Sequence, residues 1–191
     1  YLGGFFVYSM AVQTVMLVAT YFGAEEIAWA DEDAKSTGLI VSILLIQLVA
    51  VAGAVITAKL SAKYGNIPTL IGINLIWAVI CICAFFVTLP VHFYITAGFV
   101  GLVMGGIQSL SRSTYSKFLP ETQDTASFFS FYDITEKLGI VIGMLVFGAS
   151  EAIFGDIRSS VLSLVIFFTL GIVALMFVPK NENEAALSNQ E

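Results

Sequence analysis

The chain has 191 residues, of which 58% are hydrophobic and 12% charged, and its mean hydropathy is +0.93. Soluble domains are about one quarter charged, so this composition excludes an ordinary soluble domain and predicts an all-α membrane protein. The net charge is −6, with most acids in a loop at 25–33 and in the C-terminal tail. A nucleic-acid partner is excluded because no basic face accompanies them.

Six apolar stretches follow one another along the chain. A transmembrane helix needs about 20 mainly apolar residues. We expect one transmembrane domain over 1–179, with spans at about 3–24, 37–58, 67–88, 93–110, 126–150 and 160–178, and a polar cytoplasmic tail at 180–191.

The basic residues predict the orientation, because loops rich in lysine and arginine stay in the cytoplasm. With six spans, one side collects Lys59, Lys63, Arg112, Lys117 and Lys180, and the other has Lys35 and Arg158. Both ends of this segment are therefore predicted to be cytoplasmic, in a bacterial cytoplasmic membrane.

The first span carries a polar stripe. Ser9, Gln13 and Thr20 fall on one helical face, where they either bond a neighbouring helix or line a polar cavity. The span has no basic region before it and no initiator methionine, so we do not interpret it as a signal peptide. We expect Tyr1 to mark a cut in a longer chain.

Small residues recur every four positions in two spans. They are Ala50, Ala54, Ala58 and Ala62 in the second, and Ala97, Gly101, Gly105, Ser109 and Ser113 in the fourth. Such ladders predict close helix packing in lipid. A different stripe of the fourth span carries Gln108 and Arg112.

The fifth span holds an unusual charge cluster for so apolar a run, namely Asp133, Glu136 and Lys137. Charged residues deep in a membrane are costly and mark function by default. On a helical wheel they share one stripe, so we expect them to face a cavity or gate, while Gly139 and Gly143 face a neighbouring helix.

The nearest predicted partner of Lys137 is Asp133, four residues earlier. The pair is either only structural or part of a pathway for substrate or protons. Arg112, together with Glu136 or Glu121, is our candidate for a cytoplasmic gate.

A longer motif lies in the fourth and fifth spans. It reads GGIQSLSRS at 105–113, then Pro120, FFSFYD at 128–133, Lys137 and Gly143. It resembles the vacuole-effluxer-like branch of the major facilitator superfamily, whose yeast members are autophagy-related amino-acid effluxers. The resemblance implies that these helices are the C-terminal half of a twelve-helix transporter, with its first and fourth helices lining the central cavity.

Together these features predict part of a secondary active transporter that moves a small polar solute by alternating access. An amino acid is the leading candidate for the solute, and proton coupling is an open alternative. The expected partners are the lipid bilayer, the solute and either a missing N-terminal six-helix half or a second copy.

The competing hypothesis is a six-helix scaffold, or a homodimerising half-transporter without transport activity of its own. No ATP-binding loop, protease motif or hydrolase motif occurs, so an enzyme, a cofactor and a metal are not expected.

Overall fold

The computed structural model describes residues 1–119 and 125–178, whose regular structure is entirely helical. The helices are α1 (Leu2–Glu26), α2 (Glu32–Tyr64), α3 (Asn66–Ala84), α4 (Pro90–Lys117), α5 (Thr125–Phe154), α6 (Ile157–Ser163) and α7 (Val165–Met176). Because α6 and α7 adjoin, the described residues form six stretches long and apolar enough to cross a membrane. The predicted fold class is confirmed. The predicted tail at 180–191 lies outside the described residues.

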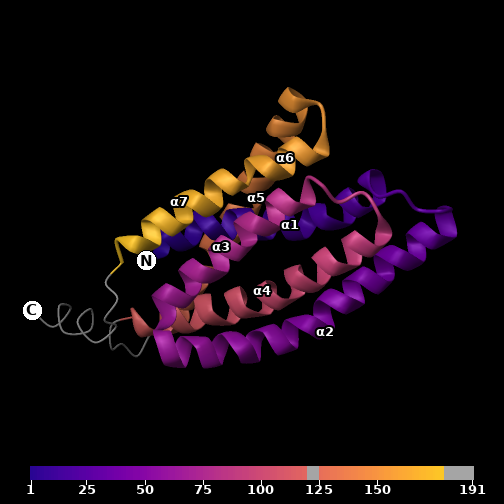
Figure 1. Cartoon of the computed structure of the whole chain (residues 1–191). Helices are drawn as coiled ribbons and strands as arrows, with labels where there is room; N and C mark the ends of the chain where they lie inside the picture. Colours follow the sequence, from indigo (N-terminus) through magenta and orange to yellow (C-terminus); the bar gives the residue numbers. More distant parts are fainter. Residues whose placement is uncertain (120–124, 179–191) are drawn as a thin grey trace, which may run out of the picture.

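Helices α2 and α4 lie side by side along much of their length (Figure 1). Their backbones approach closely at glycines: a methyl group on Gly105 would lie 2.0 Å from the Ala50 carbonyl oxygen, and one on Gly101 would lie 2.7 Å from that of Ile46. In lipid, helices associate through van der Waals packing rather than hydrophobicity, so this contact stabilises the pair. The small-residue ladders of the second and fourth spans therefore contribute to one interface.

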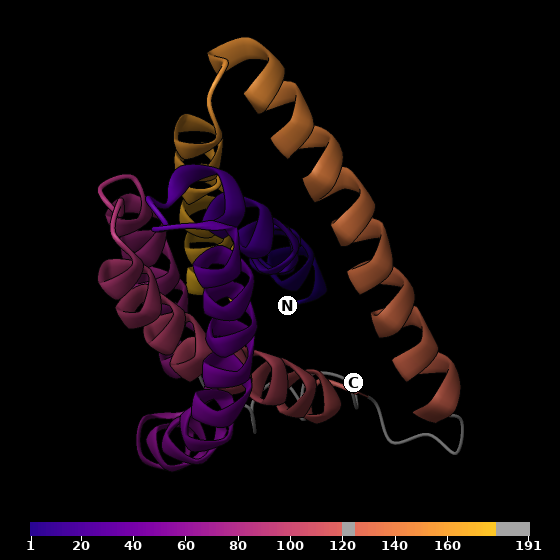
Figure 2. The same cartoon turned by 90° about the vertical axis from the view of Figure 1, so that its right-hand side faces the viewer.

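Helix α5 stands to one side of the other helices (Figure 2) and contacts α1 and α6. Its contact with α1 lies at two glycines. Gly139 faces Ser9 and Met10, and a methyl group on Gly143 would lie 2.2 Å from the Thr14 hydroxyl oxygen. The glycine face of the fifth span thus packs against a neighbouring helix, which is α1.

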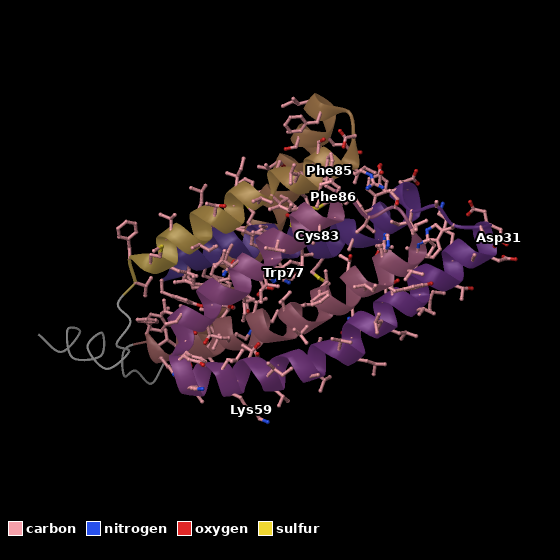
Figure 3. The ribbon with its side chains drawn as sticks, viewed as in Figure 1. Asp31, Lys59, Trp77, Cys83, Phe85 and Phe86 are labelled. Atoms are coloured by element: carbon pink, nitrogen blue, oxygen red, sulfur yellow. The ribbon has the colours of Figure 1, made fainter. Side chains whose placement is uncertain are left out.

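Side-chain hydrogen bonds show which connections share an end of the bundle. The Tyr1 hydroxyl donates to the Ser111 carbonyl oxygen at 2.9 Å, and the Asn66 amide donates to the Thr114 hydroxyl at 3.1 Å. The chain start, the α2–α3 turn and the last turns of α4 therefore meet at one end. The turn contains Gly65 at a φ of +88°, which a residue with a Cβ rarely adopts. Asp31 lies at the opposite end (Figure 3).

The interior and the outer faces differ as expected for a protein surrounded by lipid. Inside, Trp77 is fully buried, and its ring stacks on that of Phe168 with the centroids 5.9 Å apart. Outside, α2 and α5 expose apolar side chains such as Leu48 and Leu145, which are 74% and 69% exposed. Exposure of such apolar surfaces to water is unfavourable, so we expect lipid or another helical bundle to cover them.

Candidate functional site

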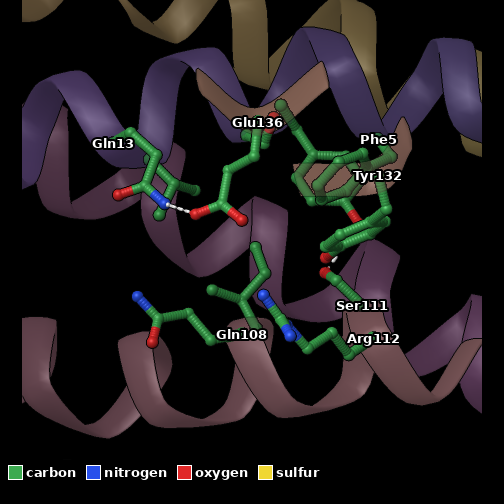
Figure 4. Close-up of a pocket in the computed structure, with 11 residues that line it drawn as sticks. Phe5, Gln13, Gln108, Ser111, Arg112, Tyr132 and Glu136 are labelled. Atoms are coloured by element: carbon green, nitrogen blue, oxygen red, sulfur yellow. Dashed lines mark hydrogen bonds between the residues drawn. The ribbon is translucent and has the colours of Figure 1, made fainter. Parts of the chain in front are cut away.

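A pocket between α1, α4 and α5 brings together polar residues that are far apart in the sequence (Figure 4). We call it the central pocket; its volume is about 120 Å³. Its lining consists of Phe5, Tyr8, Ser9, Val12, Gln13, Ile107, Gln108, Ser111, Arg112, Tyr132 and Glu136. Five of the residues selected from the sequence, Ser9, Gln13, Gln108, Arg112 and Glu136, are therefore on one pocket.

The Glu136 carboxylate is held by an amide from α1. The Gln13 side-chain nitrogen donates to its Oε1 at 2.5 Å, and both side chains are half-buried. Hydrogen bonds to a charged group are shorter and stronger than neutral ones. Gly139, one turn along α5 from Glu136, packs against Ser9 and Met10 of α1, so the two helices are in contact beside this bond.

Arg112 comes from α4 and pairs with the neighbouring acid of α5. Its Nη2 lies 2.7 Å from the Asp133 Oδ1, and its guanidinium lies 5.5 Å from the centre of the Tyr132 ring. The pair joins α4 to α5 at the end of the bundle that holds the chain start. Both side chains are about half exposed, so the bond is within reach of water.

The predicted pairing of Asp133 with Lys137 is therefore wrong. Asp133 bonds Arg112 of another helix, while Lys137 is exposed and makes no ion pair with any residue that the structure describes. The spacing of Asp133 and Lys137 along α5 permits the local pair. The Arg112 guanidinium, however, bonds the Asp133 carboxylate and also lies over the Tyr132 ring, and the Lys137 ammonium has no planar group with which to make both interactions. Arg112 lines the same pocket as Glu136, but its ion pair is with Asp133. Glu121, the other predicted gate partner, lies outside the described residues.

Aromatic side chains form one wall of the central pocket. None of these aromatic residues is among the site residues predicted from the sequence. The rings of Phe5 and Tyr132 stack with centroids 4.2 Å apart, and the Tyr8 hydroxyl shares a 2.7 Å hydrogen bond with that of Ser111. Phe5, Tyr8 and Ser9 occupy adjacent positions on α1, so the helical spacing of these aromatics beside the polar stripe was the available signal.

A second cluster joins the helices at the opposite end. Arg158 of α6 bonds the Glu26 carboxylate at 2.6 Å, the Glu26 carbonyl oxygen at 2.9 Å and the Phe85 carbonyl oxygen at 2.8 Å. It thereby links α1, α6 and the end of α3. From the sequence, Arg158 is only a loop charge, and no pattern in the sequence predicts this role.

The chain is thus a helical integral membrane protein with a charged pocket between three of its spans. The family model of vacuole effluxer Atg22-like proteins matches residues 1–187, so the chain belongs to that family. The resemblance identified from the motif at 105–143 is confirmed.

Named relatives agree with this family. The chain is 32% identical to the "Uncharacterized MFS-type transporter YxiO" of Bacillus subtilis, in a match that covers all of this chain and 43% of that protein. It is 26% identical to "Autophagy-related protein 22" of Vanderwaltozyma polyspora, over 97% of this chain and 37% of that protein, and 28% identical to that of Eremothecium gossypii, over 90% and 35%. The chain therefore spans about two fifths of the length of these relatives. The family and the first relative are described as an effluxer and a transporter, not as enzymes. No solved structure matches the chain.

Proposed function

We propose that the chain is six helices of a secondary active transporter and that its central pocket lies on the path of a small polar solute. One observation carries the proposal: a carboxylate, a guanidinium and two amides from α1, α4 and α5 converge on one pocket between membrane spans. Ionisable groups inside a membrane bundle are costly and mark solute or ion pathways. Their position between helices from one half of a bundle is typical of transporters built from two repeats.

The chemistry of the pocket favours a solute that carries both charges, such as an amino acid. Its ammonium group would bond Glu136, and its carboxylate would accept from Arg112, whose planar fork suits carboxylates. The family description as vacuole effluxers supports movement of a small solute. Glu136 is also the candidate proton carrier, because it is the carboxylate that lines this pocket and a solute or a proton could replace its hydrogen bond from Gln13.

The charged pair beside the pocket belongs to the same proposal. Arg112 and Asp133 join α4 to α5 at one end, so breaking the pair would let α5 move away from α4 there. We assign them to the cytoplasmic gate, with Asp133 in the place first given to Glu136 or Glu121. Lys137, one turn further along α5, remains a candidate for the pathway.

The chain is proposed to work with a second six-helix unit. An alternating-access site lies between two repeats, and the relatives are more than twice as long as the aligned region. The alternative, a scaffold or a homodimerising half-transporter, is favoured only by the extensive α2–α4 packing, which a scaffold would share.

A thermal-shift screen of the full-length protein tests the proposal. Amino acids, peptides, sugars and nucleosides are added singly, and Tm is measured for the wild-type protein and for Glu136→Gln. A solute at 100 times its Kd stabilises the folded state by about 2.7 kcal/mol, so an amino acid is expected to raise the Tm of the wild type.

The Glu136→Gln variant should lose that rise, whereas Lys59→Gln, an exposed lysine of α2, should keep it. If a solute stabilises the wild type and Glu136→Gln equally, the central pocket is not its site.

A further inference from the structure

Lys137 is a charged side chain of α5 that the surrounding helices leave without a counter-charge. It is exposed, and it makes no ion pair with any residue that the structure describes. The two acids nearest to it along α5 bond other helices: Asp133 pairs with Arg112 of α4, and Glu136 accepts from Gln13 of α1. Adjacent residues of a helix do not face each other, so Glu136 is also turned away from Lys137.

The depth of Lys137 along α5 makes an unpaired charge unfavourable there. Helix α5 has 30 residues, so at about 1.5 Å per residue Lys137 lies roughly 18 Å from its first residue and roughly 26 Å from its last. If a hydrocarbon core about 30 Å thick is centred on this helix, Lys137 lies roughly 10 Å inside it. Lysines near helix ends reach the headgroups, whereas ionisable residues deeper in a span are paired.

The surface around Lys137 lies on the far side of α5 from α1. On a helix of about 3.6 residues per turn, Lys137 is roughly opposite Gly139, which packs against α1. Three apolar neighbours of Lys137, namely Ile134, Leu138 and Val141, are each more than half exposed. We call these four exposed residues the outer face of α5; in Figure 2 this helix stands to one side of the others.

The charge of Lys137 distinguishes lipid from protein as the cover of the outer face. Lipid tails can cover the three apolar side chains, but they offer no acceptor to an ammonium, which carries three donors. Lys137 also shares a helical stripe with Asp133, which turns towards Arg112 and the central pocket. The outer face therefore begins beside the pocket, where a second unit that closes the pocket would meet α5.

We propose that the outer face of α5 docks a membrane helix of the second six-helix unit, and that this helix presents an aspartate or glutamate to Lys137. A carboxylate is the partner that cancels the charge as well as accepting hydrogen bonds. The relatives are long enough to contain such a unit, because this chain matches only 43% and 37% of two of them. The inference rests on the second unit of the proposed function, and it adds where that unit contacts α5 and which chemical group it must carry.

Carbodiimide coupling in the full-length protein tests the pairing. Dicyclohexylcarbodiimide enters membranes and activates carboxyl groups, which then form an amide with a lysine in direct contact. Membranes that contain the wild type are treated, and mass spectrometry of the peptides locates each link. Lys137→Gln is the negative control, and Lys59, which is exposed on α2, is the comparison lysine. The decisive sample is the wild type, so the test does not depend on the folding of a variant.

We expect an amide between Lys137 and an aspartate or glutamate that lies outside these 191 residues. A link from Lys137 to Asp133, Glu136, Glu121 or any other carboxylate of this segment would overturn the proposal, as would the absence of any link at Lys137. Saturable uptake without the link would leave the proposed function standing and remove this inference alone. The link in a protein that shows no uptake would support the docking surface and count against the transport proposal.

A pair of variants then measures the interaction. Lys137→Met leaves the linked carboxylate unpaired, and replacement of that acid by its amide leaves Lys137 unpaired. We expect each change to lower Tm in detergent and the double variant to regain at least half of the loss, because it leaves no unpaired charge. Additive losses of Tm would show that the two groups do not interact and would overturn the pairing.

Discussion

Arg112 lies between two acids of α5, bonded to Asp133 and lining the same pocket as Glu136. Because its bond to Asp133 is half exposed, it contributes at most about 1 kcal/mol to stability. A bond this weak can break and reform within a transport cycle, which is what a gate requires. The Gln13–Glu136 bond, further from solvent, would act on the solute or proton itself.

The proposal that Arg112 and Asp133 form a cytoplasmic gate makes a prediction that separates function from stability. Asp133→Asn keeps the shape of the side chain and removes the charge that holds Arg112. We expect Tm to change little. The transport rate of the full-length protein should fall by about tenfold, equivalent to ~1.4 kcal/mol in the rate-limiting step. The Arg112→Asp, Asp133→Arg double variant should recover part of the rate. If each single variant expresses poorly and the double variant restores amount and activity together, the pair is only structural.

Arg158 makes a prediction of the opposite kind, in which stability should change. Its guanidinium holds three oxygens at once, and its side chain is 17% exposed. Lysine cannot reproduce that fork, so Arg158→Lys should lower the free energy of unfolding by about 2 kcal/mol.

The change is measured as a loss of Tm in detergent. Lys35→Gln is the control. The Lys35 ammonium lies 3.7 Å from the Glu32 carboxylate, which is 87% exposed, so this ion pair should contribute less than about 0.5 kcal/mol to the free energy of unfolding. Equal losses of Tm for the two variants would show that the Arg158 cluster does not hold the helices together.

At the scale of the helices, two glycine contacts decide the packing. On the α2–α4 interface the obstacle to a larger residue is the backbone of α2, which cannot move away without separating the helices. On the α1–α5 interface a methyl group on Gly143 would lie 2.2 Å from the Thr14 hydroxyl oxygen and 2.8 Å from the Met10 carbonyl oxygen, whereas Gly139 has ordinary contact distances of 3.6 Å or more. Helix α5 is therefore fixed to α1 most tightly at Gly143.

We predict that Gly105→Ala destabilises the protein, because the new methyl group would lie 2.0 Å from the Ala50 carbonyl oxygen. Overpacking of this kind typically costs about 1–3 kcal/mol. Gly98→Ala in the same helix is the matched control: nothing lies within 4 Å of its added methyl group, and alanine favours a helix by about 1 kcal/mol. Thermal unfolding of both variants checks this, and a stable Gly105→Ala protein would show that the α2–α4 contact is looser than the structure has it.

At the scale of the whole molecule, the six-span topology predicts that Asp31 and Lys63 face opposite sides of the membrane, since α2 alone separates them. In a background without Cys81 and Cys83, a cysteine at either position should react with a membrane-impermeant thiol reagent from one side only. Asp31→Cys should be labelled from outside and Lys63→Cys from the cytoplasm, as the distribution of basic residues predicts. Labelling of both from the same face would contradict the topology.

Much of this arrangement could be predicted from the sequence, because hydropathy and helical spacing are local properties. The span count and the polar faces of three helices follow from them, and Gln13, Gln108 and Glu136 line one pocket because each lies on such a face. The partner of Arg112 could not be predicted, since it depends on the tilt of α5 against α4. The Arg158 cluster was missed for a similar reason: its acceptors include two backbone carbonyl groups, which no sequence pattern marks.

The segment alone should bind its solute poorly or not at all. Helices α1, α4 and α5 line the central pocket, and an alternating-access site is expected between two units that rock about it. Saturable uptake by proteoliposomes that contain only these 191 residues would favour the homodimerising alternative.

The central claim is that the central pocket is the solute path, and the initial rate of uptake by proteoliposomes tests it most directly. The solute is the one that the thermal-shift screen identifies, and the full-length wild type is compared with Glu136→Gln and Lys59→Gln at equal amounts of inserted protein. We predict saturable uptake by the wild type and by Lys59→Gln, and a rate lower by about tenfold or more for Glu136→Gln. Wild-type uptake by Glu136→Gln would contradict the claim.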